Sequence, residues 1–235
     1  MILTVIIPVY NEENTILKIL KKIEMQKFVK KQIIVINDGS TDLSLKKIKT
    51  FKFQSNFKIL SNKKNYGKGA CIIKAKKYIR GDIVIIQDAD LEYYPEDYKK
   101  ILNCFKNSNN LAVYGSRVLN KNRYNNKSFT SNFRILANHI LTIFSNFVNN
   151  QNLTDAHTCY KAVRAEIFKK INLCDSGFSF CPELTTKLSN LNIPIVEVSI
   201  KYNGRNFSEG KKIRFSDGII AFLTIIKYRF YKWFI

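Results

Sequence analysis

The sequence is short of acidic residues, histidines and long apolar runs, and each shortage narrows the class of protein. Only 18 Asp and Glu stand against 39 Lys and Arg, so the formal net charge is +21. An excess of this size indicates an anionic partner, such as nucleic acid, an anionic membrane surface or a phosphorylated substrate. The two histidines, His139 and His157, are too few and too far apart to predict a metal site. No stretch reaches the ~20 apolar residues of a membrane-spanning helix, which predicts a soluble or peripheral chain.

Paired cysteines are missing as well. The five cysteines are scattered, their number is odd and no C-x-x-C pair occurs, which favours reduced thiols in a cytosolic setting. Residues 1–8 lack the basic start and the cleavage site of a signal peptide, so we expect them to contain a first strand. A chain of 235 residues is long enough for one large domain with a substantial core.

Short apolar runs alternate with amphipathic helical patterns as far as residue 117. The expected strands are 3–7 (ended by a proline), 32–36, 57–60, 82–86 and 111–114. The expected helices are 16–23, 43–49, 70–79 and 96–105. Strands and helices that alternate at this spacing predict an α/β domain with a mostly parallel, doubly wound sheet.

Beyond residue 117 the pattern changes. The expected elements are a mobile basic loop at 120–132, a helix at 133–148, a strand at 156–163, a helix at 181–191, a strand at 195–200 and a charged, glycine-containing loop at 203–212. Residues 219–235 interleave aromatic side chains with Lys and Arg, which suits a helix lying in a membrane interface. A helix that packs on the domain and ends in a ragged tail is the alternative.

The clearest chemical motif is Gln87-Asp88-Ala89-Asp90-Leu91-Glu92. It follows a strand that reads as buried on both faces and precedes a helix start. Asp88 and Asp90 therefore leave the end of a core strand together, which is where ligands bind in an open α/β sheet. Their oxygens suit Mg²⁺ or Mn²⁺, which takes further ligands from substrate phosphates. A solvated acidic turn that caps the next helix is the simpler alternative for this motif alone.

Two more turns follow expected strands at the same edge of the sheet. They are Pro8-Val9-Tyr10-Asn11-Glu12 and Asp38-Gly39-Ser40-Thr41-Asp42. Tyr10 offers a ring to a base, and Asp38 offers an acceptor to a base N–H or a ribose hydroxyl. Together with the Asp88 turn, they predict a cradle for a nucleoside diphosphate.

These motifs resemble those of the family 2 nucleotide-sugar glycosyltransferases with the GT-A fold. Within that family the chain is similar to polyprenyl-phosphate glycosyltransferases of the dolichyl-phosphate mannose synthase type. The segments that carry the resemblance are 7–13, 37–42, 65–69, 87–91, 115–117, 154–155 and 205–212. The resemblance implies a single Rossmann-like domain with a mostly parallel central sheet flanked by helices. In it, residues 1–118 bind the nucleotide sugar, residues 119–217 bind the acceptor, and residues 218–235 form an amphipathic segment suited to a membrane interface.

The resemblance also implies roles for individual residues. The implied metal ligands are Asp88, Asp90 and Glu92. The implied nucleotide-sugar contacts are Pro8, Tyr10, Asn11, Glu12, Asp38, Lys68, Asp88 and Ala89. The implied acceptor-phosphate contacts are Arg134, Arg205, Lys211 and Lys212, and the implied catalytic residues are Asp90, Asp155, Arg117 and Arg205. Asn37 departs from the family pattern, since many relatives carry a second Asp there, and this bears on the sugar-nucleotide contacts.

The implied reaction is an inverting, metal-assisted single displacement that moves a hexose from a GDP- or UDP-sugar to a polyprenyl phosphate. The enzyme would work as a peripheral protein at the cytoplasmic face of a membrane. A phosphate acceptor is largely ionised near neutral pH, because its second pKa is ~6. It therefore requires cations to hold it more than it requires a general base.

Two alternative functions stay open. A family 2 transferase of surface polysaccharide synthesis would act on a saccharide hydroxyl and require a general base, for which Asp155 is the obvious candidate. A basic nucleic-acid-binding protein would also explain the net charge of +21. However, the charge is spread over many expected helices and no recognition motif appears, so no nucleic-acid partner is expected.

Overall fold

Seven strands form one sheet in the order β3-β2-β1-β4-β6-β5-β7, as a computed structural model of the chain shows. The structure describes residues 1–120, 129–205 and 215–231. The strands are β1 (Ile2–Val9), β2 (Lys30–Asn37), β3 (Asn56–Ser61), β4 (Ile83–Ile86), β5 (Ala112–Ser116), β6 (Lys161–Arg164) and β7 (Ile195–Ser199). All neighbours pair in parallel except β6, which is antiparallel to both β4 and β5. The expected mostly parallel α/β sheet is confirmed.

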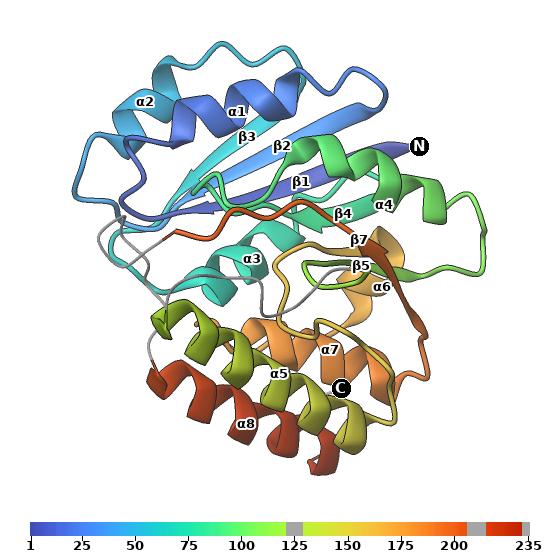
Figure 1. Ribbon diagram of the computed structural model, residues 1–235. Coiled ribbons are helices and arrows are strands. Elements are labelled where there is room, and N and C mark those ends of the chain that lie inside the picture. The colour runs from blue at the N-terminus through green and yellow to red at the C-terminus, as the bar shows by residue number, and fades with distance from the viewer. Residues whose placement is uncertain (121–128, 206–214, 232–235) are drawn as a thin grey trace.

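Helices cover both faces of this sheet. They are α1 (Ile16–Glu24), α2 (Ser44–Thr50), α3 (Lys68–Lys76), the 3₁₀ turn η1 (Pro95–Asp97), α4 (Tyr98–Cys104), α5 (Phe129–Asn149), α6 (Ala165–Lys170), α7 (Phe180–Asn190) and α8 (Phe215–Phe230). Figure 1 shows α1, α2 and α4 on one side of the sheet and α3 and α7 on the other. The central strands are therefore buried on both faces, which explains why their sequences are unbroken apolar runs rather than alternating ones.

Pro8 does not end the first strand, contrary to expectation. The strand continues to Val9, and Pro8 pairs with Ile36 of β2. Ile6 and Pro8 direct their backbone groups towards the β4 side, because residues two apart along a strand point the same way. β4 pairs with β1 only as far as Ile6, where the carbonyl accepts from the Gln87 amide at 2.9 Å. At Pro8 no strand among the described residues lies on the β4 side to accept a hydrogen bond. The missing N–H of proline therefore costs the sheet no hydrogen bond.

Two other expectations in the second half need correction. The strand expected at 156–163 is only Lys161–Arg164, because residues 155–160 form turns that carry polar side chains into the site. Helix α6 was not expected: it is one short segment directly after β6, too short to show a helical period. The remaining expected helices and strands occur within a few residues of their predicted bounds.

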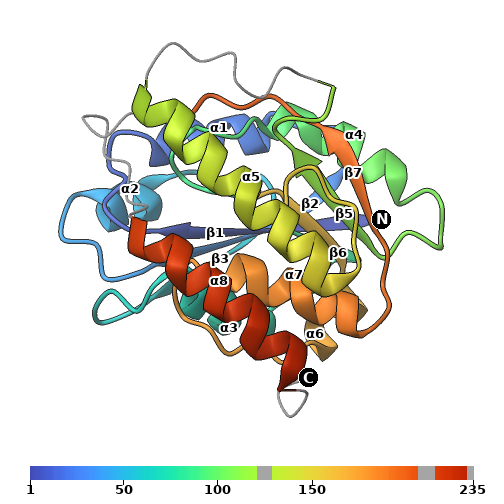
Figure 2. The ribbon, with the colours of Figure 1, turned by 60° about the horizontal axis from the view of Figure 1, so that its bottom comes forward.

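Helices α5 and α8 form an outer layer that lies against α7 rather than against the sheet. Figures 1 and 2 both show α5 and α8 side by side. The rings of Phe144 and Phe222 stack between the two helices, with centroids 4.1 Å apart. At the inner side of α8, Tyr228 donates to Asp175 at 2.9 Å. Within the ranges that the structure describes, no helix is long and apolar enough to cross a membrane.

Candidate active site

The three predicted turns meet at the carboxyl ends of β1, β2 and β4. Asn11, in the left-handed region with φ 50°, connects the first two. Its side-chain Oδ1 accepts a hydrogen bond from the backbone N–H of Thr41 at 2.9 Å. The backbone N–H of Asn11 donates to Ser40 Oγ at 3.1 Å. The amide of Glu12 donates to Ser44 Oγ at 2.8 Å. The predicted grouping of these turns is thus observed, and side chains of one turn satisfy backbone groups of the other.

Asp38 organises the entry to helix α3. Its carboxylate accepts from Asn62 Nδ2 at 2.7 Å and from the amides of Tyr66 and Gly67 at 3.0 and 2.7 Å. Gly67 has φ +97°, a conformation that side-chain-bearing residues rarely adopt. Asp38 is buried, so the chain itself engages the carboxylate for which we expected a base or ribose contact. That contact stays a prediction.

Asp88 forms a partly buried ion pair with Lys68, the first residue of α3. Lys68 Nζ lies 2.6 Å from Asp88 Oδ1 and 3.2 Å from the thiol of Cys159. Burial by itself would raise the pKa of Asp88, but the Lys68 ammonium outweighs it and the pKa is lowered. Asp88 is therefore ionised at neutral pH, and Lys68 adds a positive charge at the place where a diphosphate was expected.

Asp90 shares the guanidinium of Arg205 with two glutamates. Arg205 Nη2 lies 3.1 Å from Asp90 Oδ2, and the two Nη atoms lie 3.2 and 3.1 Å from the oxygens of Glu12. Burial and the carboxylates of Asp88 and Glu92 raise the pKa of Asp90 to about 7, although Arg205 acts in the opposite direction. Among the described residues, Arg205 therefore does not fully offset the effect of burial and of the two neighbouring carboxylates on Asp90.

Glu92 contacts the chain rather than open space. Its Oε2 accepts from the Tyr202 hydroxyl at 2.7 Å, and its Oε1 accepts from the Arg205 amide at 2.8 Å. The expected role of Glu92 as a third metal ligand is therefore not visible in these contacts. In the part of the chain that is described, no group of three or more His, Cys, Asp or Glu side chains is placed to hold a metal ion.

The paired aspartates nevertheless fit a divalent cation. Asp88 and Asp90 present hard carboxylate oxygens at the carboxyl end of a core strand, the ligand type that Mg²⁺ and Mn²⁺ prefer. The raised pKa of Asp90 is the sign that an added positive charge would be favourable there. Because Mg²⁺ commonly takes only one or two protein carboxylates and completes its shell with phosphates and water, two ligands are sufficient.

Arg117 and Asp155 form the second charged centre of the site. The guanidinium donates to both carboxylate oxygens, at 2.7 and 2.8 Å, and the Arg117 amide donates to Oδ2 at 3.0 Å. The Tyr202 ring lies 5.2 Å from the guanidinium carbon. Burial opposes ionisation of Asp155, but Arg117 outweighs it and lowers the pKa. The carboxylate is thus a weak base with both oxygens engaged.

Glu197, which we did not predict as a site residue, positions Asp155. It accepts from the amides of Thr154 and Asp155 at 2.6 and 3.0 Å. In the sequence Glu197 is the polar residue of an alternating strand, a pattern typical of a solvent-facing side chain, so only its tertiary contacts show its role. Tyr202 was also missed, since nothing in the sequence connects it to Glu92.

Some predicted residues fall outside these contacts. Lys211 and Lys212 lie outside the described residues, and so does the side chain of Arg134 at the start of α5. Ala89 is buried and Pro8 is half-buried near the strand ends, and Tyr10 is half-buried beside Asn11. The structure thus brings Glu12, Lys68, Asp88, Asp90, Arg117, Asp155 and Arg205 to one end of the sheet.

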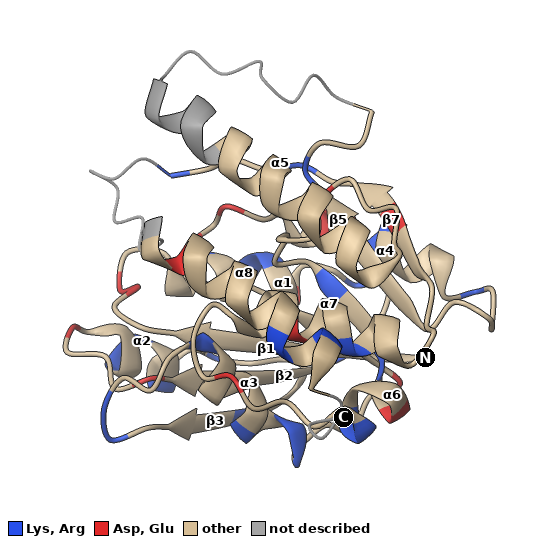
Figure 3. Ribbon diagram, turned by 90° about the horizontal axis from the view of Figure 1, so that it is seen from below, with Lys and Arg blue, Asp and Glu red and all other residues tan. Residues whose placement is uncertain are grey.

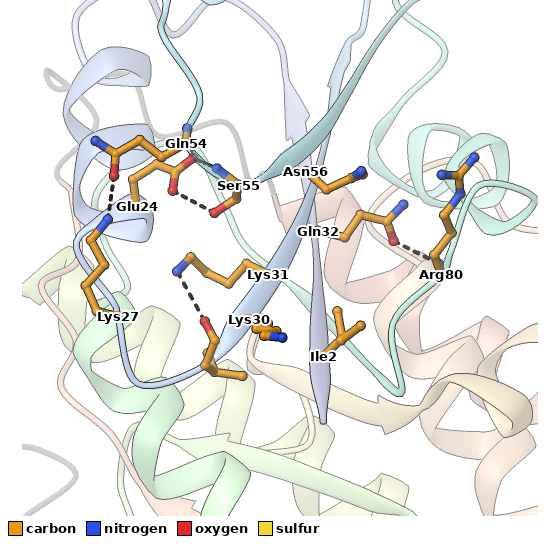
Figure 4. Close-up of a pocket in the computed structure, with 11 residues that line it drawn as sticks. Ile2, Glu24, Lys27, Lys30, Lys31, Gln32, Gln54, Ser55, Asn56 and Arg80 are labelled. Atoms are coloured by element: carbon orange, nitrogen blue, oxygen red, sulfur yellow. Dashed lines mark hydrogen bonds between the residues drawn. The ribbon is translucent and has the colours of Figure 1, made fainter.

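A separate hollow lies at the opposite edge, beside the first residues of β1 and β2 (Figure 4). Lys27, Lys30, Lys31 and Arg80 contribute its basic lining, and Glu24 bonds there to the backbone of Gln54 and Ser55. None of the predicted site residues lines it. The hollow is therefore distinct from the candidate active site.

Comparisons with known proteins agree with this geometry. The model of the family described as "Glycosyl transferase family 2" matches residues 4–172. The chain is 26% identical to a dolichol-phosphate mannosyltransferase of Pyrococcus furiosus over 98% of this chain and 64% of the relative. It is 26% identical to an undecaprenyl-phosphate 4-deoxy-4-formamido-L-arabinose transferase of Edwardsiella ictaluri over 88% of this chain and 62% of the relative. It therefore spans less than two thirds of the length of either.

A solved structure supports the same fold. The glucosyl-3-phosphoglycerate synthase of Mycobacterium tuberculosis, in complex with Mg²⁺ and uridine diphosphate, superposes with a TM-score of 0.70. The match covers 97% of this chain and 78% of that one at 16% identity. The expected GT-A fold is thus confirmed. Since the family model covers more than half of the chain, and since the turns that carry the resemblance lie together in space, this protein belongs to glycosyl transferase family 2.

Proposed function

We propose that this chain transfers a sugar from a nucleoside-diphosphate sugar, GDP- or UDP-linked, to a polyprenyl phosphate by a single inverting displacement. Relatives named for transfer to dolichyl or undecaprenyl phosphate support the acceptor class. Structural neighbours with UDP and Mg²⁺ or Mn²⁺ support a nucleotide and a divalent cation. A cation held by Asp88 and Asp90 would stabilise the negative charge that develops on the departing diphosphate.

The observation that carries the choice of acceptor is the state of Asp155. A saccharide hydroxyl would require a general base, and an effective base has a pKa near the working pH and a lone pair aimed at the substrate. Asp155 has a lowered pKa, and Arg117 engages both of its oxygens. A lipid phosphate is already ionised and requires no base, so this geometry favours it over the hydroxyl.

The remaining residues of the site then act through charge and position. Lys68, at the start of α3, faces the turn after β4, where its ammonium would meet the diphosphate. Arg205 brings a guanidinium to the boundary between the β4 turn and the 201–205 segment, where an incoming phosphate would pass. Such preorganised cations stabilise developing charge without reorganisation at the moment of reaction.

A lipid acceptor also calls for a surface that meets the membrane, and we propose that α5 and α8 provide it. The exposed apolar side chains of α5 recur at helical spacing: Leu136, Ile140, Ile143 and Phe147. Those of α8 and its end are Ile219, Ile220, Phe222, Leu223, Phe230 and Tyr231. In the parts of the two helices that are not grey, Figure 3 shows few charged residues, and those of α8 are Asp217 near its start and Lys227 and Arg229 near its end.

Apolar side chains exposed on two adjacent helices are costly in water and match the acyl boundary of a bilayer. The net charge of +21 adds attraction to anionic lipid. The five cysteines, all free thiols, are consistent with work at the cytoplasmic side of the membrane. We therefore place the protein peripherally at the cytoplasmic face.

The transfer reaction is tested with radiolabelled nucleotide sugars, undecaprenyl or dolichyl phosphate, and Mg²⁺ or Mn²⁺. We expect a labelled lipid product with a β-linkage from an α-linked donor. The same donors are offered with oligosaccharide acceptors in parallel. Label that enters the saccharide and not the lipid would refute the proposed acceptor.

The membrane surface is tested by flotation with anionic liposomes. Ile140→Asp combined with Phe147→Asp places charge on the exposed face of α5 and should prevent flotation. Met25→Asp, at an equally exposed apolar residue beside α1, is the matched control and should float like the unmodified protein. Equal flotation of all three proteins would refute the role of this face.

A further inference from the structure

One guanidinium stands among three carboxylates in the proposed cation site. Arg205 lies 3.1 Å from Asp90 and contacts both oxygens of Glu12, and its Nε lies 3.7 Å from Glu92. These acids come from the turn after β1 and the turn after β4. Arg205 therefore supplies a positive charge at the position where a divalent cation would bind Asp90.

The backbone of Arg205 is held separately from its side chain. The Arg205 amide donates to Glu92 Oε1 at 2.8 Å, and the Tyr202 hydroxyl donates to Glu92 Oε2 at 2.7 Å. The Asn203 amide donates to the Glu92 carbonyl at 3.0 Å, and Tyr93 and Tyr202 form an isolated β-bridge. The guanidinium can consequently leave Asp90 by side-chain rotation while residues 202–205 stay in place.

We propose that Arg205 is an internal counter-ion that competes with the divalent cation for Asp90 and is released when cation and nucleotide bind together. This inference rests on the proposed function. A cation of charge +2 beside a guanidinium of charge +1 is repelled, so the two occupy the acid cluster in competition. The diphosphate brings enough negative charge to neutralise both.

Release of the guanidinium implies that donor and acceptor bind in a fixed order. Until donor and cation arrive, Arg205 is paired with Asp90 and Glu12. Afterwards its charge is available to the acceptor phosphate, which charge-assisted pairing with a guanidinium would hold. The lipid phosphate should therefore bind productively only after the donor, because the same side chain cannot serve the acids and the acceptor at once.

The test measures Mn²⁺ binding without nucleotide, from the electron paramagnetic resonance signal of the free ion. Arg205→Gln removes the competing charge but keeps the backbone amide that bonds to Glu92. We expect it to bind Mn²⁺ about tenfold more tightly than the unmodified protein, within the usual range of coupling between two ligands. Arg205→Met provides the same readout should the Gln variant fold poorly.

Two controls separate competition from a general change in the loop. Arg205→Lys keeps the charge and should bind Mn²⁺ within about twofold of the unmodified protein. Lys201→Gln removes an exposed positive charge from the same segment and should leave the affinity unchanged. Titration with UDP or GDP present should bring the Mn²⁺ affinities of the unmodified protein and the variants closer together, since the diphosphate then neutralises both cations.

The outcomes distinguish this inference from the function on which it rests. If the unmodified protein binds Mn²⁺ with nucleotide, and Arg205→Gln without nucleotide binds it no more tightly than the unmodified protein, the competition is refuted and the proposed function stands. If neither protein binds Mn²⁺ even with saturating UDP and GDP, the cation is removed from the proposed function and the competition falls with it.

Discussion

Arg117 and Asp155 form a two-pronged ion pair, with Nε 2.7 Å from Oδ2 and Nη2 2.8 Å from Oδ1. The family resemblance implied both as catalytic residues, but nothing in the sequence connected one to the other. Their pairing joins the end of β5 to the turn before β6. The pairing holds Asp155 in position. It also argues against Asp155 as a general base, because both carboxylate oxygens are engaged by Arg117.

Replacing one partner of this pair should destabilise the fold. Asp155→Asn leaves the largely buried guanidinium without its counter-charge, which costs about 3–5 kcal/mol of unfolding free energy. Urea unfolding at neutral pH measures the change. The double variant Arg117→Met with Asp155→Leu removes both charges and should recover part of the lost stability. If its loss instead equals the sum of the losses of Arg117→Met and Asp155→Leu alone, the ion pair does not account for the destabilisation.

The same pair predicts a pH effect of definite sign. The pKa of Asp155 is lower in the native than in the unfolded state, because Arg117 outweighs the effect of burial. Its contribution is therefore present above the unfolded value of about 4 and is lost as pH falls through the native pKa. Acid unfolding of the double variant should start from lower stability but show a weaker dependence on pH below 4.

Lys161 predicts a rise in stability with pH in the alkaline range. Burial lowers its pKa to about 8, while an unfolded lysine titrates near 10.4. Between these values the unfolded chain binds the extra proton, so the stability contributed by this group rises with pH, by at most ~1.4 kcal/mol per unit.

Unfolding free energies of the unmodified protein and Lys161→Met, measured from pH 7.5 to 10.5, test this. The difference between the two should shift in favour of the unmodified protein as pH rises, since the buried thiols and tyrosines are common to both and cancel. A difference that is flat across this range would show that Lys161 keeps its proton in the fold.

Gly39 is predicted to tolerate no side chain. It has φ +67°, and a Cβ there would lie 2.5 Å from the Lys64 carbonyl carbon, which is backbone and cannot turn away. Gly39→Ala should cost roughly 1–3 kcal/mol and loosen the loop that Asp38 holds. Gly177→Ala is the matched control, because a Cβ there meets nothing within 4 Å. Thermal unfolding that ranks the two variants equally would contradict the argument.

The paired aspartates predict the metal requirement. Asp88→Asn and Asp90→Asn should each abolish sugar transfer, and added Mg²⁺ or Mn²⁺ should not restore it. Glu96→Gln, at an exposed residue on the following turn, is the control and should transfer normally. A double aspartate variant that retains metal-stimulated transfer would end the metal hypothesis.

The sequence alone determined the fold class and the place of the site. Unbroken β-branched runs such as Ile33–Ile36 are typical of strands buried on both faces, and their alternation with helices favours parallel pairing. Parallel strands bring their carboxyl ends to one edge, so Asn11, Asp38 and Asp88 had to meet there. These features depend on local periodicity, which sequence reports directly.

Only the tertiary structure decided which charges pair. Arg205 and Glu12 are separated by 193 residues, and Thr154 and Glu197 by 43, so no local pattern connects them. The antiparallel insertion of β6 between β4 and β5 has the same origin, since a four-residue strand carries too short a pattern to specify its neighbours. The packing of the whole chain decides which charged residues and which strands become neighbours. In this site, the ion pair with Arg117 is what makes Asp155 a poor general base.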